Sequence, residues 1–136
     1  MQPTIVEFSK RPYDYEAAFA AGRQAQIEAL MTLSSPVFST ERAAISALLA
    51  KHRLASIGAS LEQAESGFLL SLSADPAKVT RRAAEIGVRV LKGAKPADIP
   101  VEQADEFELA INAKTAKALG VKIPESVFAR ATRIVQ

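Results

Sequence analysis

Two stretches of the chain decide its fold: Val90-Leu-Lys-Gly-Ala-Lys-Pro-Ala-Asp-Ile-Pro-Val-Glu-Gln103 and Phe107-Glu-Leu-Ala-Ile-Asn-Ala-Lys-Thr-Ala-Lys-Ala-Leu-Gly-Val-Lys-Ile-Pro124. In the first stretch we predict that a helix ends at Gly93, because glycine readily adopts the left-handed conformation that closes many helices. The prolines that follow favour an extended connection. In the second stretch the apolar run Phe107–Ile111 predicts a strand.

Two helices are predicted after that strand. Asn112 is a suitable N-cap for a short helix, and Gly120 is a suitable residue to end it. Pro124 then favours the start of a last helix, because proline is well tolerated at a first helical position. We expect this last helix to end near Ile134.

Strand and helix signals also alternate through the first two thirds of the chain. Apolar, β-branched runs predict four further strands, at Thr4–Phe8, Ala29–Leu33, Ala55–Gly58 and Phe68–Leu72. Polar residues that cap helices stand between them, at Asp14, at Ser39 or Thr40, before Leu61, and at Asp75 with Pro76. The order of elements is therefore that of repeated strand–helix–strand units.

The predicted strands are continuous apolar runs without polar alternation, which indicates burial on both faces and a parallel sheet between helices. Short loops between the elements favour neighbouring strands. We therefore predict the α/β class, with a three-layer, doubly wound and mainly parallel sheet of five strands. The length of 136 residues fits one domain over residues 1–136.

Composition excludes several classes of protein. With 49% hydrophobic residues the chain can bury a core, and without cysteine it has neither disulfides nor thiolate metal sites. The net charge of +2 comes from interspersed acids and bases, which gives no support to nucleic-acid binding. No apolar run is long enough to span a membrane. The start lacks a signal-peptide pattern, so a natural chain of this sequence is expected in the cytoplasm.

The sequence shows no catalytic constellation, and we expect a protein that is not an enzyme and needs no cofactor. His52 is the only histidine, and beside Lys51 and Arg53 it suits the end of a helix, where the dipole favours cations. A metal site needs several clustered ligands, so none is expected. Neither a nucleophile elbow nor a glycine-rich phosphate loop is present.

Small polar residues follow the predicted strands and are the candidate ligand-binding residues: Ser34, Ser35, Gly58, Ser60 and Ser71. In doubly wound sheets, ligands bind in the crevice outside the carboxyl ends of the strands, where small residues leave backbone N–H groups accessible. The alternative is that serine and glycine are ordinary turn residues at these positions.

Several segments resemble one known family closely. They are Asp14-Tyr-Glu-Ala-Ala-Phe-Ala-Ala21, Phe38-Ser-Thr-Glu-Arg-Ala-Ala-Ile45, Thr80-Arg-Arg-Ala-Ala-Glu85 and the stretch from Leu91 to Gln103. These segments are similar in sequence to the second lobe and the C-terminal segment of the substrate-binding proteins of ABC transporters. The resemblance implies a periplasmic-binding-protein fold of two lobes that close on an amino acid or similar small organic solute. It also implies an ABC permease as partner and a periplasmic location.

The chain resembles one lobe only, and it departs from the family where the ligand is expected. Leu72 and Ser73 stand where the family tends to have an aromatic residue and a glycine. The resemblance therefore implies a single-lobe relative in which ligand binding is reduced or lost. The alternative is a small-molecule binding or sensor module whose cleft is rebuilt in a homodimer. A flavodoxin-like enzyme or receiver-like regulator is disfavoured, because no phosphate loop or acidic pocket follows the first strand.

A homodimer is expected in either case. The predicted helix from Pro76 to Leu91 would pack on the first lobe in a two-lobed relative. Its apolar stripe would be uncovered here, at Val79, Ala83, Ala84, Ile86, Val90 and Leu91. We expect two copies to pack through this helix, or to exchange their C-terminal segments across the connection from Lys92 to Glu102.

Overall fold

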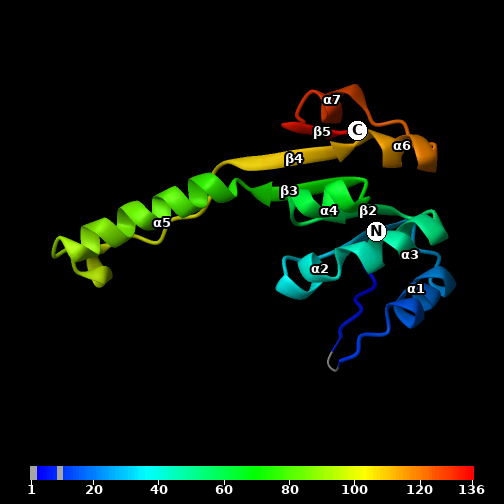
Figure 1. The fold of residues 1–136 in the computed structure, drawn as a ribbon, viewed down its shortest axis with the longest axis horizontal. Coiled ribbons are helices and arrows are strands. Elements are labelled where there is room, and N and C mark those ends of the chain that lie inside the picture. The colour runs from blue at the N-terminus through cyan, green and yellow to red at the C-terminus, as the bar shows by residue number, and fades with distance from the viewer. Residues whose placement is uncertain (1–2, 9–10) are drawn as a thin grey trace.

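A five-stranded mixed sheet forms the centre of the molecule (Figure 1). The computed structural model describes residues 3–8 and 11–136. The strands lie in sequence order across the sheet: β1 (Ala29–Met31), β2 (Ala55–Gly58), β3 (Leu70–Ala74), β4 (Phe107–Asn112) and β5 (Arg133–Val135). The helices are α1 (Tyr15–Gln24), α2 (Pro36–Thr40), α3 (Arg42–His52), α4 (Leu61–Ser66), α5 (Pro76–Leu91), α6 (Ala113–Leu119) and α7 (Glu125–Phe128), with a 3-10 turn η1 at Pro96–Asp98.

All neighbouring strands are parallel except β3 and β4, which are antiparallel. This pair runs from Leu70 opposite Ile111 to Ala74 opposite Phe107, so the two strands form a hairpin. The connection of the hairpin is α5 and the extended return through residues 92–106, which together project from the sheet as an arm (Figure 1). The backbone N–H of Asp75 donates to the carbonyl of Glu106 at 3.3 Å and closes the base of the arm. The predicted α/β class and the mainly parallel, five-stranded sheet are confirmed.

The predicted helix caps at Asp14 and Asp75 are confirmed. Asp14 Oδ1 accepts from the backbone N–H of Ala17 at 2.9 Å and begins α1. Asp75 Oδ1 accepts from the N–H groups of both Ala77 and Lys78, with Pro76 as the first residue of α5. These bonds satisfy N–H groups that have no partner within the helix.

The two predicted helix-ending glycines also lie at the ends of helices. Gly93 follows the C-terminus of α5 with φ of 99°, and Gly120 follows α6 with φ of 72°. Residues with a Cβ rarely adopt such positive φ values, so glycine is the residue that lets the chain leave each helix without strain.

The prediction that Ser39 or Thr40 caps the helix before Arg53 was wrong. Ser35 instead begins a separate short helix, α2, by accepting from the N–H of Val37 at 3.3 Å. The longer helix α3 follows at once, after Glu41, with no side-chain cap. The helix predicted after Ser39 or Thr40 corresponds to α3, whereas α2 was not predicted.

Two predictions at the ends of the chain were also wrong. Residues 4–8 are described as extended chain without strand pairing, although their β-branched pattern predicted a strand. The fifth strand is β5, in a region predicted as helix, where Ile134 lies opposite Ile111 of β4. The last helix is therefore shorter than expected and ends at Phe128. Ile134 and Val135 are β-branched and favour a strand locally, and β4 supplies the partner with which they pair.

The hydrophobic core lies between the helices and one face of the sheet. Phe19 of α1, Ile45 and Leu49 of α3, and Phe68 before β3 are buried together, and Leu30 of β1 packs against them. Helix α4 contacts β2, β3 and β4 and covers this face next to α3. Its neighbours on the strands are small, and Ser56 and Ser71 are each 1% exposed.

The opposite face of β1, β2 and β3 is not covered in this way. Met31 and Ile57 are register partners on that face and are 67% and 39% exposed, and Leu72 is 53% exposed. The sequence predicted a helical layer on both faces of the sheet. In the described part of the chain these three side chains are exposed instead of covered by helices. The prediction that the strands are buried on both faces is therefore wrong for this part of the sheet.

None of the helices in the described part of the chain is long and apolar enough to cross a membrane.

Candidate functional site

The candidate site is the edge at which the parallel strands β1 and β2 end. Because carboxyl ends of parallel strands meet at one edge, the turns after β1 and β2 lie together there. Thr32, just after β1, donates its backbone N–H to the carbonyl of Ile57 in β2 at 3.0 Å, which joins the two strand ends. Ser34, Ser35 and Ser60 stand in the turns that follow.

Ser34 and Ser35 differ in their surroundings. Ser34 is exposed, whereas Ser35 is half-buried and its hydroxyl already accepts from Val37 as the cap of α2. Ser60 precedes α4 but does not cap it. Its Oγ is buried and has no hydrogen-bond partner among the described residues. Of the three hydroxyls, that of Ser60 is therefore the buried one without a partner in hydrogen-bond geometry, and it interacts with the Glu62 carboxylate, whose pKa it helps to lower.

Gly58 is the last residue of β2 and lies against Gln63 of α4. A Cβ built on Gly58 would stand 2.8 Å from both Cβ and Oε1 of Gln63, closer than atoms without a bond between them can approach. Since the two Gln63 atoms belong to a buried side chain, a larger residue at position 58 would force α4 away from the strand. Gly58 therefore serves the packing of α4.

Gln63 is the polar centre of this edge and was not predicted from the sequence. It is 2% exposed, and its Oε1 accepts from the backbone N–H of Ala59 at 2.7 Å and from Thr32 Oγ1 at 3.4 Å. Its Nε2 donates to the carbonyl of Phe38 at 3.4 Å. One buried amide thus ties the ends of β1 and β2 to α2. Nothing in the sequence distinguishes Gln63 from an exposed helical residue.

Ser71 lies apart from the other predicted residues. Strand β3 continues to Ala74, so Ser71 is inside the strand, in register with Gly58 and Ala110, and 1% exposed. The structure brings Ser34, Ser35 and Ser60 to the strand edge and places Gly58 and Ser71 beneath α4. Any role of the five residues in binding stays a prediction.

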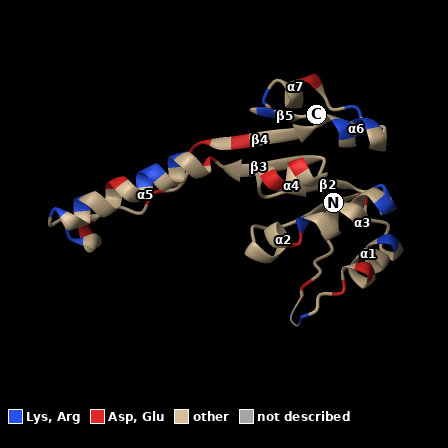
Figure 2. Ribbon diagram, viewed as in Figure 1, with Lys and Arg blue, Asp and Glu red and all other residues tan. Residues whose placement is uncertain are grey.

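The electrostatics of this edge are mild. The pKa of the Glu62 carboxyl, in the first turn of α4, is lowered chiefly by a hydrogen bond from its own backbone N–H. Acidic and basic residues are distributed over several elements of the described chain (Figure 2). Within residues 3–8 and 11–136, no group of three or more histidines or acids is placed to hold a metal ion.

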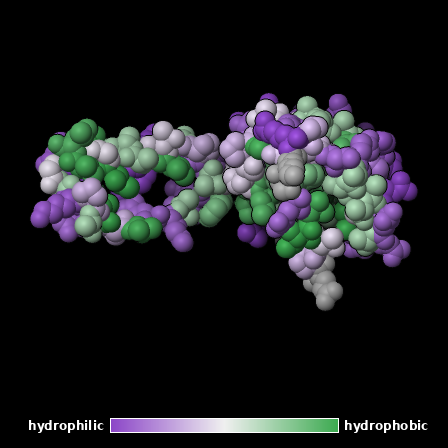
Figure 3. Space-filling model, turned by 90° about the horizontal axis from the view of Figure 1, so that it is seen from below, coloured by the Kyte–Doolittle hydropathy of each residue, from purple (hydrophilic) through white to green (hydrophobic). Residues whose placement is uncertain are grey.

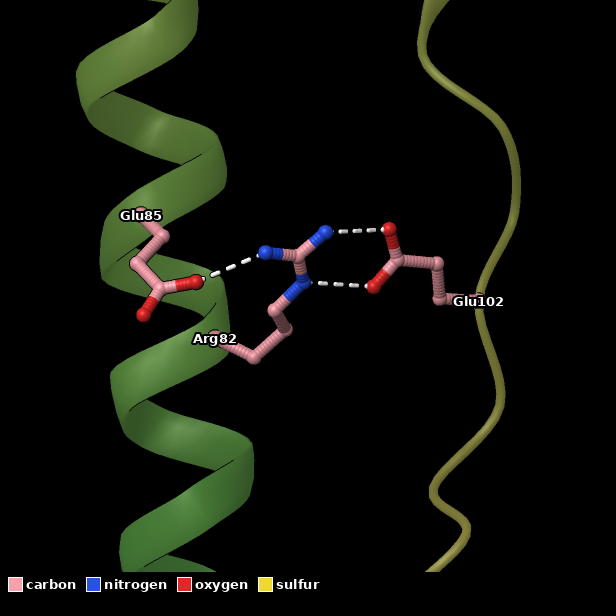
Figure 4. A network of polar contacts seen from close by, with 3 residues as sticks. All are labelled: Arg82, Glu85 and Glu102. Carbon is pink, nitrogen blue, oxygen red and sulfur yellow. Dashed lines mark hydrogen bonds and ion pairs between the residues drawn. The ribbon is translucent and has the colours of Figure 1, made fainter.

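A network of ion pairs holds the arm together. The Arg82 guanidinium binds the Glu102 carboxylate through two bonds of 2.6 Å, from Nε and Nη2, and Glu85 at 2.7 Å from Nη1 (Figure 4). Lys78 and Glu106 form a second pair near the base of the arm. Arg82 lowers the pKa of Glu102, and Glu102 in turn raises the pKa of Arg82. The return segment is thereby fixed along α5.

Replacing Arg82 with alanine is expected to release the return segment from α5. Thermolysin should then cleave at the exposed Val101 several-fold faster, because a loosened extended segment enters a protease more readily. The melting temperature should change little, since exposed ion pairs contribute little to stability. The matched control is Arg81→Ala, which removes a neighbouring cation outside this network. Equal cleavage rates in the two variants would show that the network does not hold the arm.

The arm is amphipathic and lacks a covering partner among the described residues. No residue of α5 is buried, and Val79, Val88, Val90 and Leu91 are 46%, 47%, 37% and 88% exposed. Ile86 is half-buried. Hydrophobic atoms lie beside charged ones along the arm (Figure 3). The predicted apolar stripe of α5 is therefore exposed at Val79, Val90 and Leu91 and half-buried at Ile86.

Comparisons with known proteins agree with this architecture. The family model of the ABC transporter substrate binding protein matches residues 24–135. No match was found among curated proteins. A solved structure of a conserved domain protein from Vibrio cholerae O1 biovar El Tor is 25% identical, with a TM-score of 0.78 over 88% of this chain and 40% of its own.

Two further solved structures are similar. One is an ABC domain from Streptococcus pneumoniae in complex with L-Trp, 25% identical with a TM-score of 0.77 over 88% of this chain and 41% of its own. The other is the ligand-free, open form of a substrate binding protein with adhesive properties from Clostridium difficile. It is 19% identical, with a TM-score of 0.66 over 90% of this chain and 40% of its own.

The chain thus spans about two fifths of the length of the solved structures that it matches. The family match covers most of the sequence, including β1 to β5 and the arm. The two parallel pairs at the candidate edge, the hairpin and the projecting arm are all inside the matched region. The chain belongs to the family of ABC transporter substrate-binding proteins.

Proposed function

We propose that this chain supplies one half of the cleft of a solute-binding protein. Outside the inner membrane, such a protein would deliver a small organic solute to an ABC permease. The observation that carries the proposal is the edge after β1 and β2, where Ser34, Ser35 and Ser60 stand in turns at strand ends. Ligands of open α/β sheets bind at such edges. An amino acid is the first solute to test, because one similar structure holds L-Trp.

Binding by this chain alone is proposed to be weak or absent. Two surface cavities of about 330 Å³ each lie in the described residues, and neither is lined by Gly58, Ser60 or Ser71, although Ser35 lines the one beside α2. The Gln63 side chain fills the space over Gly58. A ligand at this edge would therefore meet few groups on its outer side, and tight sites bury most of the ligand.

A thermal-shift screen tests this proposal. Purified chain is heated with L-tryptophan, the other amino acids and small organic acids, each at about 1 mM. A ligand at a hundred times its Kd raises stability by about 2.7 kcal/mol, so tight binding is easily seen. We expect no shift for the chain alone. A clear rise in melting temperature with any of these solutes would contradict the proposal of weak binding. It would show that the chain alone forms a complete site.

The second candidate is a binding or sensor module in which a homodimer rebuilds the cleft. The exposed apolar residues of α5 favour it, because uncovered hydrophobic surfaces of this kind are common at interfaces. Sedimentation equilibrium at micromolar concentration tests the dimer, with Val90→Asp as the variant and Val88→Asp, on the other side of α5, as its control. We expect a dimer that V90D dissociates. A strict monomer would refute this candidate.

A further inference from the structure

A cavity lies beside α2, next to Phe38, whose carbonyl accepts from Gln63 Nε2. Its volume is about 330 Å³, and it is lined by Val6, Glu7, Phe8, Tyr13, Ser35, Val37 and Phe38. The lining comes from two separate parts of the chain, the segment before α1 and the start of α2. Aromatic residues make up only 6% of the sequence, so three rings in one cavity are a marked concentration.

The rings form one edge-to-face cluster centred on Phe8. The Phe8 centroid lies 5.5 Å from that of Tyr13, 5.1 Å from that of Tyr15 and 6.3 Å from that of Phe38, with interplanar angles of 63° to 75°. In such clusters the rings are fixed at steep angles, so that their faces point in different directions. Ring faces are negative and attract cations.

A cation already uses one of these faces. The guanidinium carbon of Arg11 lies 5.5 Å from the Tyr13 ring centroid, and Tyr13 raises the pKa of Arg11. Arg11 is fully exposed and does not line the cavity. Its position shows that the rings at this place can hold a positive charge on their outer side.

The other polar groups of the cavity also fit a cation with a hydroxyl arm. Glu7 adds a full negative charge to the ring faces, and Ser35 Oγ, which accepts from Val37, still has a proton to donate. A cation in the cavity can pair with the acid of Glu7, whereas a neutral ligand of the same shape gains nothing from it. The lining therefore favours a positively charged ligand over a neutral one of the same shape.

We propose that this cavity is a binding site for a small alkylammonium cation of the size of choline, held by the rings of Phe8, Tyr13 and Phe38 and by the Glu7 carboxylate. The site does not depend on the proposed solute cleft, with which it shares only Ser35. Recognition of quaternary ammonium by several rings and an acid is an established use of the cation–π interaction.

Tyrosine fluorescence tests the proposal directly. The chain has no tryptophan, and its two tyrosines, Tyr13 and Tyr15, both belong to the cluster. Burial raises the pKa of Tyr15 to about 12, so this side chain is a neutral phenol at ordinary pH. Choline is titrated against its uncharged isostere 3,3-dimethylbutan-1-ol. We expect a saturable change with choline, and binding of the isostere that is weaker by about tenfold.

Variants separate the charge from the shape of the site. Glu7→Gln should weaken choline binding by about fivefold or more, whereas Glu28→Gln, an exposed acid outside the cavity, should leave it unchanged. Phe38→Leu should also weaken it, and circular dichroism checks that this variant folds. Equal binding of choline and its isostere, no response to choline at about 10 mM, or equal affinities of E7Q and E28Q would each overturn the proposal.

These outcomes are distinct from those of the solute screen. Loss of the choline response would leave the proposed cleft untouched, because neither Ser60 nor Gln63 lines the cavity. A fluorescence response to L-tryptophan cannot be read in the same way, since the ligand itself fluoresces. Indole derivatives are therefore kept for the thermal-shift experiment.

Discussion

Replacing Phe68 with alanine is expected to lower the free energy of unfolding by about 3–5 kcal/mol. Phe68 is 0% exposed and packs in the core with Phe19, Ile45 and Leu49, at the point where α4 leads into β3. Removing the ring leaves a cavity between three elements that cannot all move inward together. Urea denaturation followed by circular dichroism measures the change.

The control for this variant is Phe128→Ala in α7, where the ring is 47% exposed. We expect a loss of less than about 1 kcal/mol there, because much of that ring already contacts water. If the two variants lost similar stability, the cluster around Phe68 would not be the main core of the molecule. A change in the slope against urea would instead indicate a different unfolded state.

Replacing Asn112 with alanine is expected to cost about 2–4 kcal/mol, because it removes a helix cap and a buried hydrogen bond together. Asn112 is 5% exposed and ends β4. Its Oδ1 accepts from the backbone N–H of Thr115 at 2.8 Å and caps α6. Its Nδ2 donates to the carbonyl of Ala64 at 2.8 Å, which links the sheet to the end of α4.

The variant Asn112→Asp separates the two bonds. The carboxylate still caps α6, but at neutral pH it has no proton to donate to Ala64. Its pKa should therefore be raised in the folded state, and this variant should be relatively more stable at about pH 4 than at about pH 7. The wild-type chain is measured at both values as the reference. A loss in N112D that does not depend on pH would show that the bond to Ala64 contributes little.

Local signals in the sequence predicted those parts of the fold that depend on a few neighbouring residues. Asp14, Asp75 and Asn112 cap helices as expected, since a short side chain reaches the free N–H groups two or three residues ahead. Gly93 and Gly120 end helices because their backbone has positive φ. The family resemblance in the stretch from Leu91 to Gln103 was confirmed by the family model.

The candidate site was predicted less completely. The sequence indicated that small residues follow β1 and β2, and the structure places Ser34, Ser35 and Ser60 there. It gave no sign that Gln63 occupies the centre, because a glutamine between a glutamate and an alanine resembles any exposed helical residue. Only its bonds to Ala59, Thr32 and Phe38, which come from three other segments, identify it.

By itself, then, the sequence determined the α/β class, the order of most elements, the helix caps at Asp14, Asp75 and Asn112, and the family. Tertiary structure alone decided that β4 runs antiparallel to β3, that residues 133–135 form a strand, and that residues 4–8 do not. The physical reason is that strand pairing and burial depend on partners far along the chain. A cap is complete within four residues, whereas Ile134 becomes part of a strand only because Ile111 lies opposite it.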